Sequence, residues 1–187
     1  ADFGMTRPYT TAGRFEKIHD RLVVYTAISK TFNMAGLGSS CMMIPNPELK
    51  QKISDSYDAC WMFGPCDLAF TAMEAAYTHG DAWVDQQLAY LEGNVETVNT
   101  FVAEHMPGVQ VTKHEGTFLM WLDMTCFGKS SRELTSILAK EYGLALGDGS
   151  HYGTQAEGFM RLNIGCTRDT LIKGLEQMAV MYDKYVK

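Results

Sequence analysis

An apolar run that stops at a lysine is the feature that most restricts the fold of this chain. Residues 21–28 read Arg-Leu-Val-Val-Tyr-Thr-Ala-Ile, in which β-branched and aromatic side chains dominate. Such a run is typical of a strand that is buried on both faces of a parallel sheet. We therefore predict an α/β fold in which Lys30 lies at the carboxyl end of this strand.

Lys30 is a candidate reactive group because of that position. In open α/β sheets the ligand crevice lies at the carboxyl ends of the strands, so we expect the amine to point into a site and away from bulk solvent. Desolvation favours the neutral form of an amine, and a neutral amine can condense with an aldehyde. The alternative is a lysine on a surface loop, which the position alone does not exclude.

Arg161 is the second candidate, because it lies in the apolar run Phe-Met-Arg-Leu-Asn-Ile at residues 159–164. A buried guanidinium without a partner is costly, so Arg161 needs either a protein carboxylate or an anionic ligand. Its planar fork suits two parallel hydrogen bonds to the α-carboxylate of an amino acid. The pattern alone leaves open an ion pair within the protein.

Composition and charge argue against several classes of protein. The 187 residues are 46% hydrophobic and 20% charged, and the formal net charge is -6 at pH 7. Without a cluster of Lys and Arg, nucleic acid is not expected as a partner. No stretch approaches the roughly 20 apolar residues of a membrane helix, and residues 1–5 have neither a charged leader nor a long apolar run. We expect neither a membrane segment nor a signal peptide.

The cysteines and histidines do not suggest a metal site. The five cysteines are odd in number and scattered, without a Cys-x-x-Cys pair, and the five histidines lack the spacing of metal ligands. We interpret the cysteines as reduced thiols of a cytoplasmic protein.

Helix signals dominate the middle of the chain. Asn-Pro-Glu at residues 46–48 combines an N-cap, a proline at the first helical position and an acid in the first turn. A second helix is expected over residues 68–78. Apolar residues then recur in steps of three and four from residue 84 to residue 102, which predicts a long helix of about six turns that ends at Pro107-Gly108.

The pattern changes to period two from residue 109. Apolar strands over residues 109–111 and 117–123 follow one another, which suggests an antiparallel pair. Residues 147–153 are rich in glycine and are expected to form a mobile loop that leads to a strand over residues 159–164. With the helices between them, these strands predict a small α+β lobe.

Two helices belong to this lobe. Ser130 and Glu133 have the spacing of a capping box, and the helix that they open is closed by Gly143. The last helix is amphipathic, and Thr167 can cap it.

Four segments stand in an order that belongs to one enzyme family. They read Ser-Lys-Thr-Phe-Asn-Met-Ala-Gly-Leu at residues 29–37, Glu-Ala-Ala-Tyr at 74–77, Glu-Gly-Thr-Phe-Leu-Met-Trp-Leu-Asp at 115–123 and Gly-Phe-Met-Arg-Leu-Asn-Ile-Gly-Cys at 158–166. They resemble fold-type I pyridoxal phosphate (PLP) enzymes of the aminotransferase class I/II superfamily, most closely the MalY/PatB-type cystathionine β-lyase (C-S lyase) branch. The resemblance covers essentially the whole chain.

The resemblance implies the carboxyl-terminal half of the aspartate aminotransferase-like architecture. Residues 1–80 would be the last part of the PLP-binding large domain, residues 81–107 a long connecting helix, and residues 108–187 the small C-terminal α+β domain. The amino-terminal half would carry the aspartate for the pyridinium nitrogen, the aromatic residue that stacks on the ring, and the helix that cradles the phosphate. This chain alone is expected to be inactive.

The resemblance also implies a homodimer. The stretch at residues 60–66 would lie near the dimer interface, where Trp61 or Phe63 would border a site in the neighbouring subunit. An aromatic loop that packs into its own core is the alternative.

The resemblance assigns roles to four residues. Lys30 would hold PLP and remove the Cα proton, and Ser29 would contact the cofactor phosphate, steady the lysine, or bond only to its own backbone. Arg161 and Asn163 would hold the carboxylate of a sulfur-containing amino acid. Elimination at Cβ would then release a thiol, pyruvate and ammonia.

Two departures and two alternatives accompany this interpretation. Gly38 stands where many aminotransferases have an arginine against the phosphate, which favours the lyase, and Thr167 stands where the branch usually has proline.

A class I/II aminotransferase is the alternative enzyme. The PLP-binding domain of a transcriptional regulator is the alternative of another class.

Overall fold

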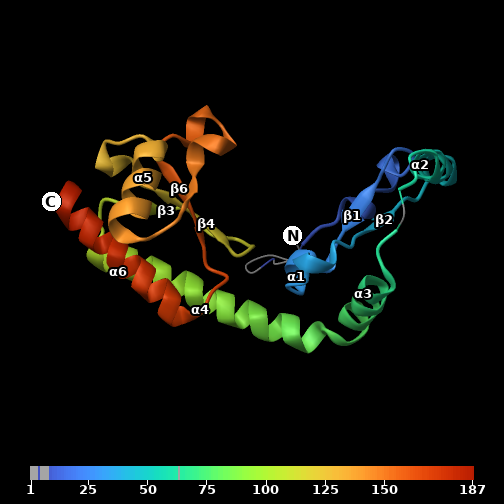
Figure 1. Ribbon diagram of the computed structural model, residues 1–187, viewed down its shortest axis with the longest axis horizontal. Helices are drawn as coiled ribbons and strands as arrows, with labels where there is room; N and C mark the ends of the chain where they lie inside the picture. Colours follow the sequence, from blue (N-terminus) through green and yellow to red (C-terminus); the bar gives the residue numbers. More distant parts are fainter. Residues whose placement is uncertain (1–3, 5–8, 63) are drawn as a thin grey trace. The chain divides into compact units, whose positions relative to one another are not determined.

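The computed structural model describes Gly4 and residues 9–62 and 64–187 (Figure 1). The chain divides into two compact units, Ala1–Gln87 and Leu88–Lys187. Phe63, predicted as an alternative to Trp61 to border a neighbouring site, lies outside the described residues. No helix in the described part of the chain is both long and apolar enough to cross a bilayer.

The first unit contains a two-stranded sheet, in which β1 (Val24–Thr26) pairs antiparallel with β2 (Cys41–Met43). The prediction of a longer strand, buried on both faces of a parallel sheet, is therefore wrong, and Tyr25 is 63% exposed. A parallel partner needs a crossover of a dozen or more residues, usually through a helix. Only the short α1 (Ile28–Thr31) and the 3-10 turn Ala35–Leu37 lie between these two strands.

The helices of the first unit lie close to their predicted positions. The side-chain oxygen of Asn46 accepts hydrogen bonds from the backbone N–H groups of Glu48 at 2.9 Å and Leu49 at 3.2 Å, which starts α2 (Pro47–Ala59). The helix α3 (Asp67–His79) follows. Two 3-10 turns precede β1, at Ala12–Arg14 and Glu16–Ile18.

The predicted long helix is α4 (Asp81–His105), which runs from the first unit into the second. Its Leu91, Val98 and Val102 are buried, as the apolar spacing predicted. The division into a large-domain part, a connecting helix and a small domain stays a prediction.

The second unit is built on a four-stranded antiparallel sheet of order β3-β4-β6-β5. The predicted pairing of the first two of these strands is confirmed. Side chains alternate along the two central strands, so that one face is buried and the other is partly open to solvent. The strands are β3 (Gln110–Val111), β4 (Leu119–Asp123), β5 (Gly147–Asp148) and β6 (Phe159–Asn163).

The two predicted helices of this unit begin at their predicted caps. The capping box of Ser130 and Glu133 opens α5 (Ser131–Tyr142), and Gly143 closes it in a left-handed conformation. Thr167 caps α6 (Arg168–Tyr185) by accepting a hydrogen bond from the backbone of the first turn. Local side-chain signals therefore set both helix starts.

The core of the second unit lies between the sheet and the helices. In Figure 1, α6 runs beside α4, and the backbone N–H of Gly108, just after α4, donates to the Tyr182 hydroxyl of α6 at 2.9 Å. Buried side chains from the sheet and the three helices fill the core, among them Leu91, Val98, Met120, Leu122, Leu134, Leu138, Met160, Leu162, Leu175 and Met178.

Residues 147–153, predicted to be a mobile loop, contain two short regular elements, so the prediction of a loop is wrong. They form β5, which pairs with β6, and then the 3-10 turn η5 (Gly149–Tyr152). The Asp148 carboxylate accepts hydrogen bonds from the backbone N–H of Ser150 at 2.9 Å and from its hydroxyl at 2.6 Å. A side chain that caps a turn in this way compensates for the flexibility of the glycines around it.

Candidate active site

Lys30 lies on α1, a single helical turn that follows β1 directly. Ile28 and Thr31 on the same turn are buried and anchor it, whereas Lys30 is exposed and Ser29 is half-buried. The prediction that the amine points away from solvent is therefore wrong for this chain. The physical reason is the small sheet, because two short strands cannot enclose a crevice at their ends.

An aromatic cluster holds the lysine segment against the rest of the first unit. The Phe32 ring packs edge-on against Tyr77 with a centroid distance of 5.7 Å and stacks on Trp83 at 6.2 Å. The hydroxyls of Tyr77 and Thr26 lie 3.2 Å apart, within hydrogen-bond distance. The segment that carries Lys30 is thus fixed to α3 and to the start of α4.

Two further features near Lys30 are not evident from the sequence alone. Asn33 has a positive φ of 55°, a conformation that asparagine tolerates better than most residues. The hydroxyl of Ser39 is buried and has no hydrogen-bond partner among the described residues. A desolvated hydroxyl without a partner is unfavourable, so Ser39 marks a polar group that a ligand or another part of the protein can satisfy.

Arg161 lies on β6, between Trp121 of β4 and Gly147 of β5. Its side chain is half-buried and belongs to the open face of the sheet, opposite the buried Met160 and Leu162. Its guanidinium carbon lies 5.0 Å from the centroid of the Tyr152 ring. No carboxylate forms an ion pair with Arg161 in the part of the chain that the structure describes.

Asn163 lies two residues further along the same face and is exposed. Its side-chain oxygen accepts a hydrogen bond from the backbone N–H of Gly165 at 2.8 Å. This local bond uses the acceptor and leaves the amide N–H groups as the donors that a carboxylate could bind.

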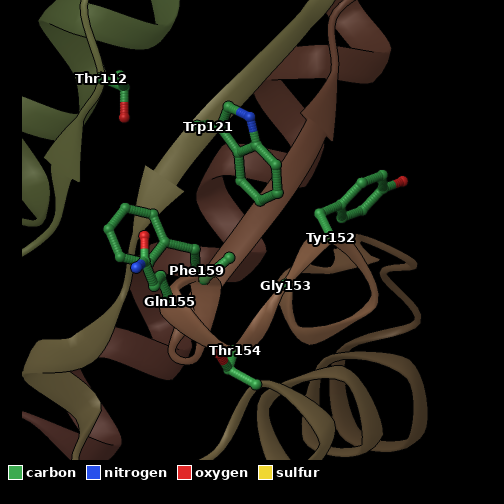
Figure 2. Close-up of a pocket in the computed structure, with 8 residues that line it drawn as sticks. Thr112, Trp121, Tyr152, Gly153, Thr154, Gln155 and Phe159 are labelled. Carbon is green, nitrogen blue, oxygen red and sulfur yellow. The ribbon is translucent and has the colours of Figure 1, made fainter.

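A cavity of about 470 Å³ opens on the same unit beside Trp121, Tyr152 and Phe159 (Figure 2). The Trp121 ring packs edge-on against Tyr152 at 5.3 Å and against Phe159 at 6.4 Å. The sequence pattern alone does not identify these rings as a group. The local signal for Trp121 and Phe159 is the alternation of side chains along β4 and β6, whereas Tyr152 lies on η5 and has no such signal.

The turn that carries Tyr152 is held by Asp148. Hydrogen bonds from the Ser150 hydroxyl and from the Ser150 backbone N–H hold the pKa of the Asp148 carboxyl below its usual range, although partial burial opposes them. The carboxylate form therefore stabilises the turn.

The predicted site residues fall into both units. Lys30 and Ser29 belong to the first unit, and Arg161 and Asn163 belong to the second. Their roles in binding and catalysis stay predictions.

The chain matches a known family over most of its length. A family model described as aminotransferase class I and II matches residues 1–178, so the chain belongs to this family. Cystathionine beta-lyase PatB of Bacillus subtilis (strain 168) is 38% identical over 159 residues, which cover 85% of this chain and 41% of PatB. Protein MalY of Escherichia coli (strain K12) is 32% identical over 155 residues, which cover 80% of this chain and 39% of MalY.

A solved structure agrees with these relatives. Cystalysin from Treponema denticola, which contains a pyridoxal 5'-phosphate cofactor, matches with a TM-score of 0.91 and 26% identity over 100% of this chain and 48% of cystalysin. The predicted fold-type I architecture and the resemblance to the PatB and MalY branch are confirmed. The chain spans about two fifths of the length of the curated relatives it matches.

Proposed function

We propose that the protein containing this chain is a PLP-dependent carbon-sulfur β-lyase that acts on cystathionine or a related cysteine S-conjugate. The observation that carries this proposal is the 38% identity with the cystathionine beta-lyase PatB. The accessible amine of Lys30 in the segment at residues 29–37 is consistent with it.

The residues of the first unit fit PLP in their chemistry. Lys30 offers an accessible amine for the cofactor aldehyde, and Ser29 beside it offers a hydroxyl for the phosphate. When bound, the pyridine ring of PLP accepts electron density from the substrate carbon.

The protein residues would then share the work of elimination. Arg161 binds the substrate carboxylate and Asn163 assists it, while Lys30 takes the proton from Cα. The bond between Cβ and sulfur breaks, and sulfur leaves as a thiol. The remaining three-carbon enamine reacts with water to give pyruvate and ammonia.

We also propose two partners for this chain, namely the remaining part of the protein and a second copy of the whole protein. The remaining part of the protein would complete the cofactor site, and two copies would form a homodimer. This chain alone would be inactive, because the resemblance assigns the aspartate for the ring nitrogen, the stacking aromatic residue and the phosphate-cradling helix to another part of the protein.

A class I/II aminotransferase is the second candidate, and the description of the matched family favours it. The two activities share Lys30 and Arg161 but differ in the fate of the substrate. One assay of the full-length protein separates them: formation of pyruvate and thiol from cystathionine without a keto acid supports the lyase. Turnover that depends on a keto acid rejects the lyase and supports the aminotransferase.

The role of Lys30 is tested by covalent trapping. Reduction of the PLP-loaded full-length protein with borohydride should attach the cofactor to the peptide that contains Lys30, as measured by mass spectrometry. Lys30→Ala should abolish this adduct, whereas Lys50→Ala, at an exposed position on α2, should retain it. An adduct that persists in Lys30→Ala would contradict the assignment.

A further inference from the structure

The open face of the sheet in the second unit brings one cation and three aromatic rings together. Arg161 and Trp121 are directly opposite each other on β6 and β4, so their side chains leave the sheet on the same face. Tyr152 contacts both, with its ring 5.0 Å from the guanidinium carbon and 5.3 Å from the Trp121 ring. Phe159, two residues before Arg161, extends this face.

The charge of Arg161 is available to a ligand. Contact with a ring does not consume the N–H donors of a guanidinium, which remain able to bind a carboxylate. No protein carboxylate pairs with Arg161 among the described residues. The Arg161 guanidinium therefore lies beside aromatic rings, and no acidic side chain among the described residues neutralises its charge.

The neighbouring cavity has the size and lining of a small-molecule site. Its volume of about 470 Å³ lies within the usual range of ligand pockets. Trp121, Tyr152 and Phe159 form apolar walls, and Thr112 and Gln155 add neutral polar groups (Figure 2). None of the described residues that line it carries a charge near neutral pH.

We propose that this cavity receives the side chain of the amino acid whose carboxylate Arg161 binds, and that it selects thioether and aromatic side chains. Sulfur and aromatic groups both interact favourably with aromatic rings, whereas a charged side chain would lose hydration without gaining a partner. Tyr152 is a positioning residue that holds Arg161. The inference rests on the proposed function in two respects, because it takes an amino acid as the substrate and Arg161 as the residue that binds its carboxylate.

The test measures binding without chemistry. Full-length protein freed of cofactor is titrated by calorimetry with propionate, 3-(methylthio)propionate and 3-phenylpropionate, which lack an amino group. The two longer carboxylates should bind more tightly than propionate. Trp121→Ala should weaken their binding about tenfold or more and change propionate binding by less than about twofold, whereas Arg161→Gln should weaken all three.

Conservative variants separate positioning from folding. Tyr152→Leu should weaken all three carboxylates, and Tyr152→Phe should restore their binding because it keeps the ring. Tyr57→Ala removes an aromatic residue of α2 outside the cavity and should change nothing. If Trp121→Ala does not fold, Phe159→Leu provides the same comparison between long and short carboxylates.

Two outcomes would overturn the proposal. Equal weakening of all three carboxylates by Trp121→Ala would show that the cavity does not select the side chain, and unchanged binding would show that it does not receive it. A negative lyase assay with the expected binding order would reject the proposed activity and keep the pocket.

Discussion

Gly147 determines how much room the Arg161 side chain has. A Cβ at this position would lie 3.1 Å from both Cβ and Nε of Arg161, closer than ordinary contacts. Gly147→Ala should therefore displace the guanidinium by a few tenths of an ångström and weaken carboxylate binding about tenfold, because loss of one hydrogen bond to a charged group costs about 1.5 kcal/mol. Calorimetry with propionate on the full-length protein measures the change.

Gly174→Ala is the matched control for this substitution. It adds the same methyl group in the same unit, where the nearest atom is the end of the flexible Leu144 side chain at 3.3 Å. Carboxylate binding should not change in this control. Equal affinities of the Gly147→Ala variant and the unmodified protein would refute the steric argument.

At the scale of single residues, the sequence pointed to Arg161 and not to Tyr152. A charged residue in an apolar strand is visible in the local pattern, because its burial has an evident cost. The contact with Tyr152 joins two elements whose approach depends on the pairing of β5 with β6. No periodicity of the sequence encodes that approach.

At the scale of elements, Ser131 links the start of α5 to the segment before β6. Its buried hydroxyl accepts a hydrogen bond from the backbone N–H of Gly158 at 2.7 Å. Ser131→Ala should lower the free energy of unfolding by about 1–3 kcal/mol, because it leaves this buried N–H without a partner. Urea denaturation of the chain measures the loss.

Ser136 on the same helix provides the comparison. Ser136→Ala should leave stability nearly unchanged, since alanine has the higher helix propensity. A loss in Ser136→Ala as large as that in Ser131→Ala would mean that the hydrogen bond to Gly158 is not the cause.

The helix starts that could be predicted to the residue are those with side-chain caps. Asn46, Ser130 and Thr167 start helices where their side chains accept backbone hydrogen bonds, and these signals are local. The one-turn helix α1 is too short for a periodic pattern, and β5 depends on its pairing with β6. Both elements carry or support the candidate site, so the site was harder to predict than the fold.

At the scale of the whole molecule, the two units differ in how much apolar surface they bury. The buried apolar side chains in the described part of the first unit are Leu22, Ile28, Ala69 and Ala76, whereas the second unit has a continuous core between its sheet and three helices. Burial of apolar surface is the main favourable contribution to folding. The second unit should therefore be the more stable of the two in this chain.

Hydrogen exchange of the isolated chain tests this difference. Amides of β4, β6 and α6 should exchange at least about a hundredfold more slowly than those of β1 and α2, because local opening is easiest where few apolar side chains are buried. In the full-length protein the amides of the first unit should become protected if the remaining chain packs against its exposed aromatic residues. Equal protection of both units in the isolated chain would contradict the argument, because the first unit would then be stable without further partners.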